Sequence, residues 1–236
     1  PARKSWQESV AESVARAAQT TTTHAQVNRV ATAPDTNFRP DPAPTPVVLL
    51  SELTYELLDR LEWKRVELIV ALYFAETGAR AECTCIGADG GVDVQLYRNG
   101  EQTPYCYVQC KAFGPKVDVK LVRELLGVMS AAKITEGVFV TTGRYTKDAL
   151  NFAAQNNIQA ISGVGFVDRF NQLPFDARTR ILSKVTEGDY TTPTCSQCDI
   201  KMVLSSREPP QWRCRRCNNR QYVRKSRWSA LRAAKR

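Results

Sequence analysis

The chain has 236 residues, 43% of them hydrophobic, which allows one domain of ordinary size with a small module attached. Its formal net charge of +9 lies entirely in the segment 195–236, where twelve lysines and arginines face only Asp199 and Glu208. A polyanion such as DNA is therefore expected to bind near the C-terminus. The longest apolar stretch, residues 66–75, is far shorter than the ~20 residues that cross a bilayer. No membrane span is expected in this sequence, and an anchor upstream of it stays open.

Residues 1–49 are predicted to be a disordered arm that ends in a proline-rich linker. Five prolines between Pro34 and Pro46 fix φ repeatedly and remove backbone donors, so an extended spacer is favoured. Apolar residues four apart in the segment 6–14 leave a short amphipathic helix as the alternative.

The segment 50–174 carries the periodic patterns of a folded α/β domain. Apolar residues recur with the 3.6-residue period of a helix over 63–77, and the pattern stops at Gly78. Then follow strand-like runs at 79–85, 92–97 and 105–111, a helix at 117–133, a strand at 137–141, a helix at 146–156, a strand at 158–161 and a helix that begins near Gly163. This order predicts one mixed central sheet flanked by helices, because strand–helix–strand crossovers favour parallel pairing while the early strands can pair as hairpins. We expect residues 175–193 to be a linker.

Alternation within two of these strands places three polar side chains together. In 92–97, Asp93 points away from the apolar face, and in 105–111 Gln109 and Lys111 share one face. A tight two-residue turn ending at Gly100 would place Cys106, not Gln109, on the Asp93 face. Convergence of Asp93, Gln109 and Lys111 therefore predicts an odd-length loop or a glycine bulge near Gly100.

These side chains suit phosphodiester hydrolysis, which needs an activated water, a metal that neutralises charge on the phosphate, and a nearby cation. Asp93 can supply an oxygen ligand for Mg²⁺, and Gln109 can add an amide or backbone oxygen beside it. Lys111 can orient the water and stabilise the developing negative charge. Glu67, at the edge of the apolar face of the 63–77 helix, either completes the site or is a solvated surface charge.

Three motifs occur in order along this region: GADGGVD at 87–93, YVQCK at 107–111 and GVFVTTG at 137–143. Over about 50–174 the chain thereby resembles the Mrr-like restriction endonucleases, a branch of the PD-(D/E)xK nuclease fold. The resemblance implies that Asp93, Gln109 and Lys111 are catalytic, with Glu67 as an accessory carboxylate and Mg²⁺ as cofactor. Gln109 stands where the wider superfamily has an acidic residue, as is usual in the Mrr-like branch. Asp89, in the first motif, either holds the glycine turn or joins the metal.

Histidine chemistry is excluded from the folded region, because the only histidine, His24, lies in the expected disordered arm. Four cysteines lie within the expected domain, at positions 83, 85, 106 and 110. They could form a second metal site, but we favour core packing, because Cys106 and Cys110 lie on the predicted core face.

Four more cysteines in the C-terminal segment form two Cys-x-x-Cys pairs. Cys195 with Cys198 and Cys214 with Cys217 are separated by fifteen residues, a spacing that suits a closed tetrahedral zinc site. Four thiolate ligands leave no open position for catalysis, so the expected Zn²⁺ is structural. Tight cysteine pairs favour metal over disulfides, and hence a reducing, cytoplasmic setting.

The stretch CSQCDIKMVLSSR resembles the zinc ribbons at the C-terminal ends of bacterial type IA topoisomerases, and the likeness covers 194–222. It implies contact with single- or double-stranded DNA. We expect a zinc ribbon at 194–224 with Trp212 in its small core, followed by a basic tail at 225–236. The expected DNA contacts are Arg213, Arg215, Arg216, Arg220 and Arg224.

The sequence thus predicts a magnesium-dependent endonuclease of restriction type that hydrolyses double-stranded DNA, with a zinc ribbon that aids DNA binding. Alternatives are a repair or recombination nuclease acting on branched or damaged DNA, an RNA-cleaving enzyme, and a non-catalytic DNA-binding protein that kept the fold. The intact set of Asp93, Gln109 and Lys111 argues against the last of these. Cutting of both strands suggests a homodimer, and no small-molecule substrate is expected.

Overall fold

A computed structural model describes residues 50–84, 91–112, 116–207 and 210–222. The expected arm and linker at 1–49, Cys85, Asp89, Arg224 and the basic tail at 225–236 lie outside the described residues. Within the described ranges, no helix is both long enough and apolar enough to cross a membrane.

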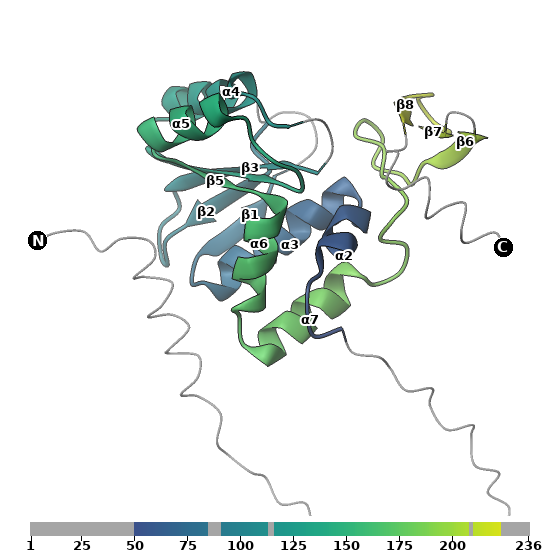
Figure 1. Ribbon diagram of the computed structural model, residues 1–236, viewed down its shortest axis with the longest axis horizontal. Coiled ribbons are helices and arrows are strands. Elements are labelled where there is room, and N and C mark those ends of the chain that lie inside the picture. The colour runs from purple at the N-terminus through teal and green to yellow at the C-terminus, as the bar shows by residue number, and fades with distance from the viewer. Residues whose placement is uncertain (1–49, 85–90, 113–115, 208–209, 223–236) are drawn as a thin grey trace, which may run out of the picture.

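The central layer is a five-stranded sheet with the strand order β1-β2-β3-β4-β5 (Figure 1). Its strands are β1 (Arg80–Cys83), β2 (Val94–Tyr97), β3 (Cys106–Lys111), β4 (Glu136–Thr141) and β5 (Ile158–Ile161). The first three strands pair antiparallel, and β4 and β5 are added in parallel. The mixed sheet predicted from the order of elements is therefore confirmed.

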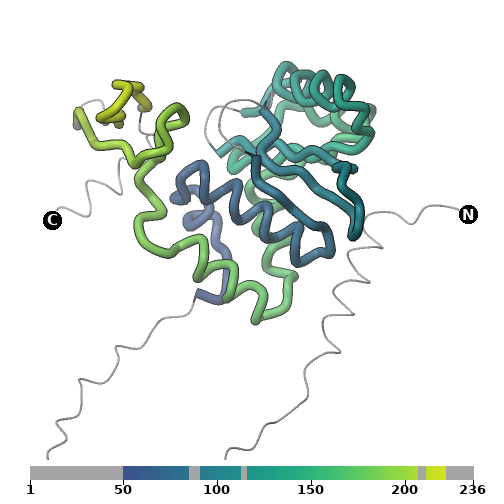
Figure 2. Tube along the Cα trace, turned by 180° about the vertical axis from the view of Figure 1, so that it is seen from behind, coloured from purple at the N-terminus to yellow at the C-terminus, as the bar shows by residue number. Residues whose placement is uncertain are grey.

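Helices cover both faces of this sheet (Figures 1 and 2). On one face lie α2 (Tyr55–Arg60), α3 (Trp63–Glu76), α6 (Gly163–Asn171) and α7 (Phe175–Val185), and on the other lie α4 (Val119–Ala131) and α5 (Lys147–Gln155). Side chains along β3 point alternately to the two faces of the sheet. Cys106 and Val108 join the α3 cluster on one face, and Tyr107 packs against the cluster of α4 and α5 on the other. Side chains of Asp118, Thr146 and Ser162 cap the N-termini of α4, α5 and α6.

Two helices differ from the expectation. Residues 175–193 are not simply a linker, because α7 buries Ala177, Ile181, Leu182 and Val185 against the α3 layer. The short helix α2 was not expected either; Thr54 caps it, and Leu58 is buried in the same layer. Both helices complete the hydrophobic face of α3, so the folded core extends past the expected boundary at 174.

The C-terminal module, residues 194–222, is named the ribbon from here on. It contains an antiparallel three-stranded sheet of β6 (Val203–Arg207), β7 (Pro210–Arg213) and β8 (Arg220–Tyr222). Figures 1 and 2 show it beside the N-terminal end of α3. The expected small β module is therefore present.

Candidate active site and four-cysteine cluster

Asp93 lies immediately before β2, and both its main chain and its side chain are bound to neighbouring strands. Its backbone N–H donates to the carbonyl of Val108 at 2.9 Å, and its own carbonyl accepts from the N–H of Thr84 at 3.1 Å. Carboxylate Oδ2 accepts a hydrogen bond from the N–H of Cys110 at 2.6 Å. Asp93 therefore bonds to the residues on either side of Gln109, which fixes its carboxylate at the end of the sheet ladder.

The register between β2 and β3 confirms the predicted odd-length connection. Leu96 pairs with Cys106 and Val94 pairs with Val108, so that nine residues lie between the paired Leu96 and Cys106. Gly100, within this connection, has a φ of +84°, a conformation that glycine adopts without steric cost. The connection is therefore not a tight two-residue turn. Asp93, just before β2, lies beside the end of β3 that bears Gln109.

Gln109 presents a buried oxygen that lacks a hydrogen-bond partner. Its Oε1 atom is inaccessible to solvent, and no donor in the described part of the chain reaches it. Its Nε2 atom lies against Gly91, where a Cβ would come within 2.9 Å. A buried amide oxygen left unpaired costs roughly 1–3 kcal/mol, so this orientation calls for a ligand or another role.

Glu67 projects from α3 toward Asp93. The pKa of the Glu67 carboxyl is raised to about 8, first by burial and then by the charge of Asp93 and a hydrogen bond to the Asp93 side chain. Two carboxylates in contact repel each other when both are ionised, so burial beside Asp93 favours the protonated form of Glu67. The structure thus brings Glu67 and Asp93 together, as expected.

Lys111 follows Gln109 on β3 at the spacing that places both on the same face of the sheet. Its carbonyl accepts hydrogen bonds from Thr141 Oγ1 at 3.1 Å and from the N–H of Thr142 at 3.2 Å. These bonds fix the backbone of Lys111 against β4 at the carboxyl end of the parallel strands. The side chain of Lys111 is half-buried, and its backbone is held in place by these bonds.

The oxygen atoms at this end of the sheet fit a hard divalent cation. Glu67 and Asp93 supply two carboxyl groups in contact with each other, and Gln109 supplies a buried neutral oxygen without a partner among the described residues. A cation such as Mg²⁺ favours carboxylate and amide oxygens.

The three described cysteines of the domain pack as core residues or lie on its surface. Cys106 is buried in the α3 cluster, Cys110 packs against it, and Cys83 is exposed on β1. Burial raises the pKa of the Cys110 thiol, and the nearby Asp93 and Glu67 raise it further. Core packing of Cys106 and Cys110 is confirmed, and the only cysteine cluster among the described residues lies in the ribbon.

The four ribbon cysteines lie on two loops with matching backbone geometry. In the first loop Asp199 donates its N–H to Cys195 O at 3.0 Å, and in the second Asn218 donates to Cys214 O at 3.1 Å. Asp199 and Asn218 both have positive φ, at 57° and 63°. Asp and Asn tolerate this left-handed conformation better than most residues, which explains why each follows the second cysteine of its pair.

The sulfur positions suit one metal ion. All four Sγ atoms lie within 4.8 Å of one another, and those of Cys195 and Cys217 are 3.5 Å apart. Metal–sulfur bonds of ~2.3 Å in a tetrahedron place the sulfurs ~3.8 Å apart. The cluster Cys195, Cys198, Cys214 and Cys217 is therefore a metal-binding candidate of the zinc ribbon type.

The rest of the ribbon divides between core and surface. Trp212 and buried Met202 pack against the cysteine cluster, which confirms Trp212 as a core residue. The arginines in the described part of the module are exposed: Arg213, Arg215, Arg216 and Arg220. Because long basic side chains at a surface can reach phosphates, their exposure suits the expected DNA contacts.

Glu62 joins the ribbon to α3, a role that the sequence did not reveal. Its side chain is only 2% exposed and accepts hydrogen bonds from the N–H of Thr194 at 2.9 Å, the Thr194 hydroxyl at 3.1 Å and Lys201 Nζ at 3.1 Å. The indole N–H of Trp63 donates to Thr194 O at 2.7 Å. These contacts join residues more than 130 positions apart, so no local pattern could indicate them.

Comparison with known families identifies the domain. Residues 58–170 match the family model Mrr_cat, described as a restriction endonuclease. The match places this part of the chain in the class of nucleases of restriction type. The match covers most of the region in which the three motifs predicted an Mrr-like restriction endonuclease domain.

Similarity to other characterised proteins is weak. No curated protein matches the sequence. A crystal structure of a protein of unknown function, AF1548, is 18% identical with a TM-score of 0.35, over 42% of this chain and 56% of that chain. The MspJI restriction endonuclease in complex with a 27-mer oligonucleotide is 20% identical with a TM-score of 0.39, over 61% of this chain and 36% of that one. The chain thus spans less than two thirds of either structure.

Proposed function

We propose that this protein is a magnesium-dependent endonuclease that hydrolyses phosphodiester bonds of double-stranded DNA. The family match supports restriction-type nuclease chemistry. The observation that carries the finer proposal is the Asp93 carboxylate, held by the Cys110 N–H in contact with Glu67 and next to the strand that bears Gln109 and Lys111. Structural rather than catalytic carboxylates are normally paired with a basic side chain or solvated, whereas here Glu67 is buried in contact with a second carboxyl, that of Asp93, and its pKa is raised to about 8.

The proposed ligand set for Mg²⁺ is Asp93 and Gln109, with Glu67 as an accessory carboxylate. When bound, the ion would neutralise charge on the scissile phosphate and lower the pKa of the attacking water. Asp93 contributes a carboxylate whose position is fixed by the Cys110 N–H, which limits the reorganisation needed for catalysis. Gln109 would contribute its buried Oε1, and Glu67 would add a second carboxylate when it is ionised.

Lys111 is proposed to act on the water and on the phosphate. Its ammonium group orients the attacking water and stabilises the negative charge that develops on the phosphate oxygens. The water oxygen forms the new bond to phosphorus and gives up a proton to solvent, the bond to one sugar oxygen breaks, and that leaving oxygen takes up a proton from solvent. The anchored backbone of Lys111 supports this role by limiting where its side chain can reach.

The ribbon is proposed to bind a structural Zn²⁺ and to raise affinity for DNA. Four thiolates complete a tetrahedral site and leave no position for substrate. The expected phosphate contacts are Arg213, Arg215, Arg216, Arg220 and Arg224, the last of which lies outside the described residues. Contacts of this kind would hold DNA without reading its sequence.

Plasmid cleavage tests the proposal. Wild-type protein should nick and linearise supercoiled plasmid with Mg²⁺, and neither Asp93→Asn nor Lys111→Ala should cut. Matched controls are Asp118→Asn, at the cap of α4, and Lys120→Ala, an exposed residue of α4, and both should cut like the wild type. Parallel reactions with methylated, unmodified, branched, single-stranded and RNA substrates separate restriction from repair and from RNA cleavage. Binding without cutting on every substrate would refute the catalytic proposal.

A further inference from the structure

The ribbon is docked on α3 through a buried polar contact. Glu62 is the N-cap residue of α3, yet its side chain makes no capping bond within that helix. It binds Thr194 instead, while the neighbouring Trp63 binds the Thr194 carbonyl, so that Thr194 is held through its N–H, hydroxyl and carbonyl. Because buried charge-assisted bonds of this kind are directional, they fix the ribbon in one orientation rather than leave it on a tether.

Two ion pairs reinforce this contact on either side. Lys201 of the ribbon pairs with Glu62, and Lys64 of α3 pairs with Asp199 in the first cysteine loop. Arg65, next on α3, donates to the carbonyls of Lys184 and Glu187, at the end of α7 and just after it. The start of α3 is thus bound to the ribbon and also to the segment that connects α7 with the ribbon.

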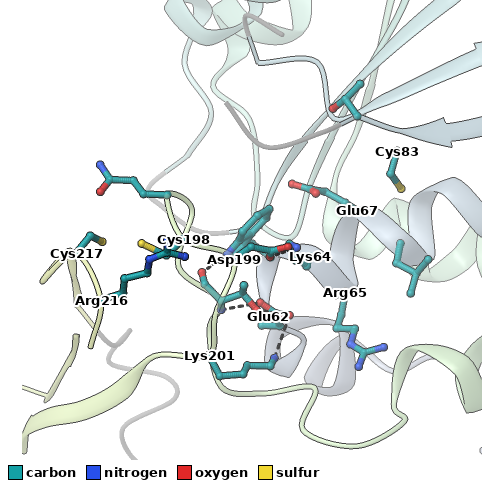
Figure 3. A pocket seen from close by; sticks show the side chains of 15 residues that line it. Glu62, Lys64, Arg65, Glu67, Cys83, Cys198, Asp199, Lys201, Arg216 and Cys217 are labelled. Atoms are coloured by element: carbon teal, nitrogen blue, oxygen red, sulfur yellow. Dashed lines mark hydrogen bonds and ion pairs between the residues drawn. The ribbon is translucent and has the colours of Figure 1, made fainter. Parts of the chain in front are cut away.

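A cleft of about 1150 Å³ lies between the docked ribbon and the nuclease domain (Figure 3). One side is formed by α3 and the end of β1, and it includes Glu67 of the candidate active site. The other side is formed by the two cysteine loops, with Gln197, Cys198, Arg216 and Cys217. The cleft therefore extends from Glu67, which contacts Asp93, to two cysteines of the proposed zinc site.

The charges in this cleft suit an anionic chain. Two of its acidic residues, Glu62 and Asp199, are paired with Lys201 and Lys64 in the docking contact. Arg216 is exposed and lines the ribbon side, as Figure 3 shows, and Glu67 lies on the opposite side. A phosphodiester backbone that passes between them would meet the guanidinium of Arg216 on one side and reach Glu67, the accessory carboxylate beside Asp93, on the other.

We propose that this cleft holds the backbone of the DNA strand that enters the candidate active site, and that the Glu62 contact keeps the ribbon in place as its outer wall. This inference rests on the proposed function, because it assigns a substrate path to the same site. It gives the ribbon a positioning role in addition to general affinity. The strand that enters the site should therefore contact the cleft side of the ribbon more closely than the surface of β6 that bears Leu204.

Photo-crosslinking tests which side of the ribbon meets DNA. A benzoylphenylalanine is placed at Gln197, exposed on the cleft side, or at Leu204, which is 40% exposed on β6 and does not line the cleft. Both probes are made in Asp93→Asn protein, which should bind an end-labelled DNA duplex without cutting it. Crosslinking from position 197 should exceed that from position 204 several-fold. Equal yields, a reversed ratio, or no crosslink from either position would overturn the inference.

A second comparison tests the docking contact. With the probe at position 197, Glu62→Gln removes one charged acceptor of Thr194 and Lys201 and should lower the crosslink yield several-fold toward that of position 204. Glu76→Gln, which changes an ion-paired glutamate at the other end of α3, should leave the yield unchanged. An unchanged yield in folded Glu62→Gln protein would overturn the role of the contact. If Glu62→Gln does not fold, Lys201→Met removes the ion pair from the more exposed side, with the same expectation.

The outcomes separate this inference from the proposed function. Crosslinking needs only binding, whereas cleavage is measured separately with the wild-type protein. Strong crosslinking from position 197 without any cleavage would refute the proposed nuclease activity but support the proposal that DNA lies in the cleft. Cleavage accompanied by crosslinks that favour position 204 would keep the nuclease and refute the path.

Discussion

Gly91 lies directly against the side-chain amide of Gln109. A Cβ at position 91 would come within 2.9 Å of Gln109 Nε2, and Gly91 has a φ of +94°. Both facts require glycine, the first because it leaves space for the amide and the second because L side chains rarely adopt this conformation. The orientation of the proposed metal ligand Gln109 thus depends on a residue two positions before Asp93.

Gly91→Ala should therefore impair cleavage more than it impairs folding. The matched control is Gly100→Ala, which has a similar φ of +84° but open space around the added Cβ. Both variants should lose about 1 kcal/mol of stability from the backbone conformation. Only Gly91→Ala should displace Gln109 and raise the Mg²⁺ concentration needed for half-maximal cleavage. Metal titrations and urea unfolding of both variants check this, and equal metal dependence would contradict it.

Gln109→Leu should reduce metal-dependent cleavage without destabilising the fold. The change removes a buried oxygen that has no partner in the described structure, so stability should stay equal or rise. Loss of a proposed ligand should weaken the apparent Mg²⁺ affinity roughly tenfold or more. Gln95→Leu on β2 is the control, because Gln95 Oε1 accepts from the Tyr97 hydroxyl at 2.7 Å. That variant should lose stability and keep its metal dependence; the opposite pattern would remove Gln109 from the site.

Glu67 should make the stability of the protein fall as pH rises in the absence of added divalent cation. Its pKa is about 8 in the folded state and about 4.5 ordinarily, so the folded state binds the proton more tightly. The resulting stabilisation is fully present below pH 4.5 and is lost as pH rises through about 8. Urea unfolding between pH 5 and about pH 8, with the ribbon metal left in place, measures this slope. Glu67→Gln should flatten it and Glu76→Gln should not, whereas identical slopes in all three proteins would refute the assignment.

The sheet and the pairing near Asp93 could be predicted because polar and apolar residues alternate along the strands, which is a pattern visible in the sequence. Alternation in β2 and β3, together with the requirement that Asp93 and Gln109 share an end of the sheet, was enough to predict an odd-length connection. The cysteine spacing likewise predicted the ribbon cluster. Helix α7 was missed although Ala177, Ile181 and Val185 recur at helical spacing, because the segment was assigned to a linker.

The docking of the ribbon could not be predicted in the same way. In the sequence, Glu62 is an ordinary charged residue before a helix. Its burial depends on contacts with Thr194 and Lys201, which belong to the ribbon. The raised pKa of Glu67 was also invisible, since it arises from burial and from the approach of Asp93 in the folded chain. Both features are tertiary contacts between segments that sequence patterns treat separately.

Removal of the ribbon metal should unfold the ribbon and leave the nuclease domain folded. The ribbon core consists of little besides Met202, Trp212 and the cysteines, whereas the domain has its own large clusters. Hydrogen exchange after zinc chelation should show lost protection in 194–222 and retained protection in α3, α4 and α5. The domain should still lose roughly 1–3 kcal/mol, because Glu62 loses the partners that satisfy its buried carboxylate. Cys214→Ser should mimic chelation and Cys83→Ser should not; joint loss of protection in both parts would contradict separate folding.

The exposed arginines of the ribbon should set the salt dependence of DNA binding. Each phosphate contact contributes about 0.9 to the slope of log K against log salt concentration on duplex DNA. Arg213→Gln and Arg220→Gln, tested in the non-cutting Asp93→Asn protein by fluorescence anisotropy, should each reduce that slope by about this amount. Arg98→Gln is the control, because Arg98 is also exposed but pairs with Glu101 and Glu136 in the nuclease domain, away from the ribbon. If the slope changes equally for Arg98→Gln, or not at all for the ribbon variants, the phosphate contacts must lie elsewhere on the protein.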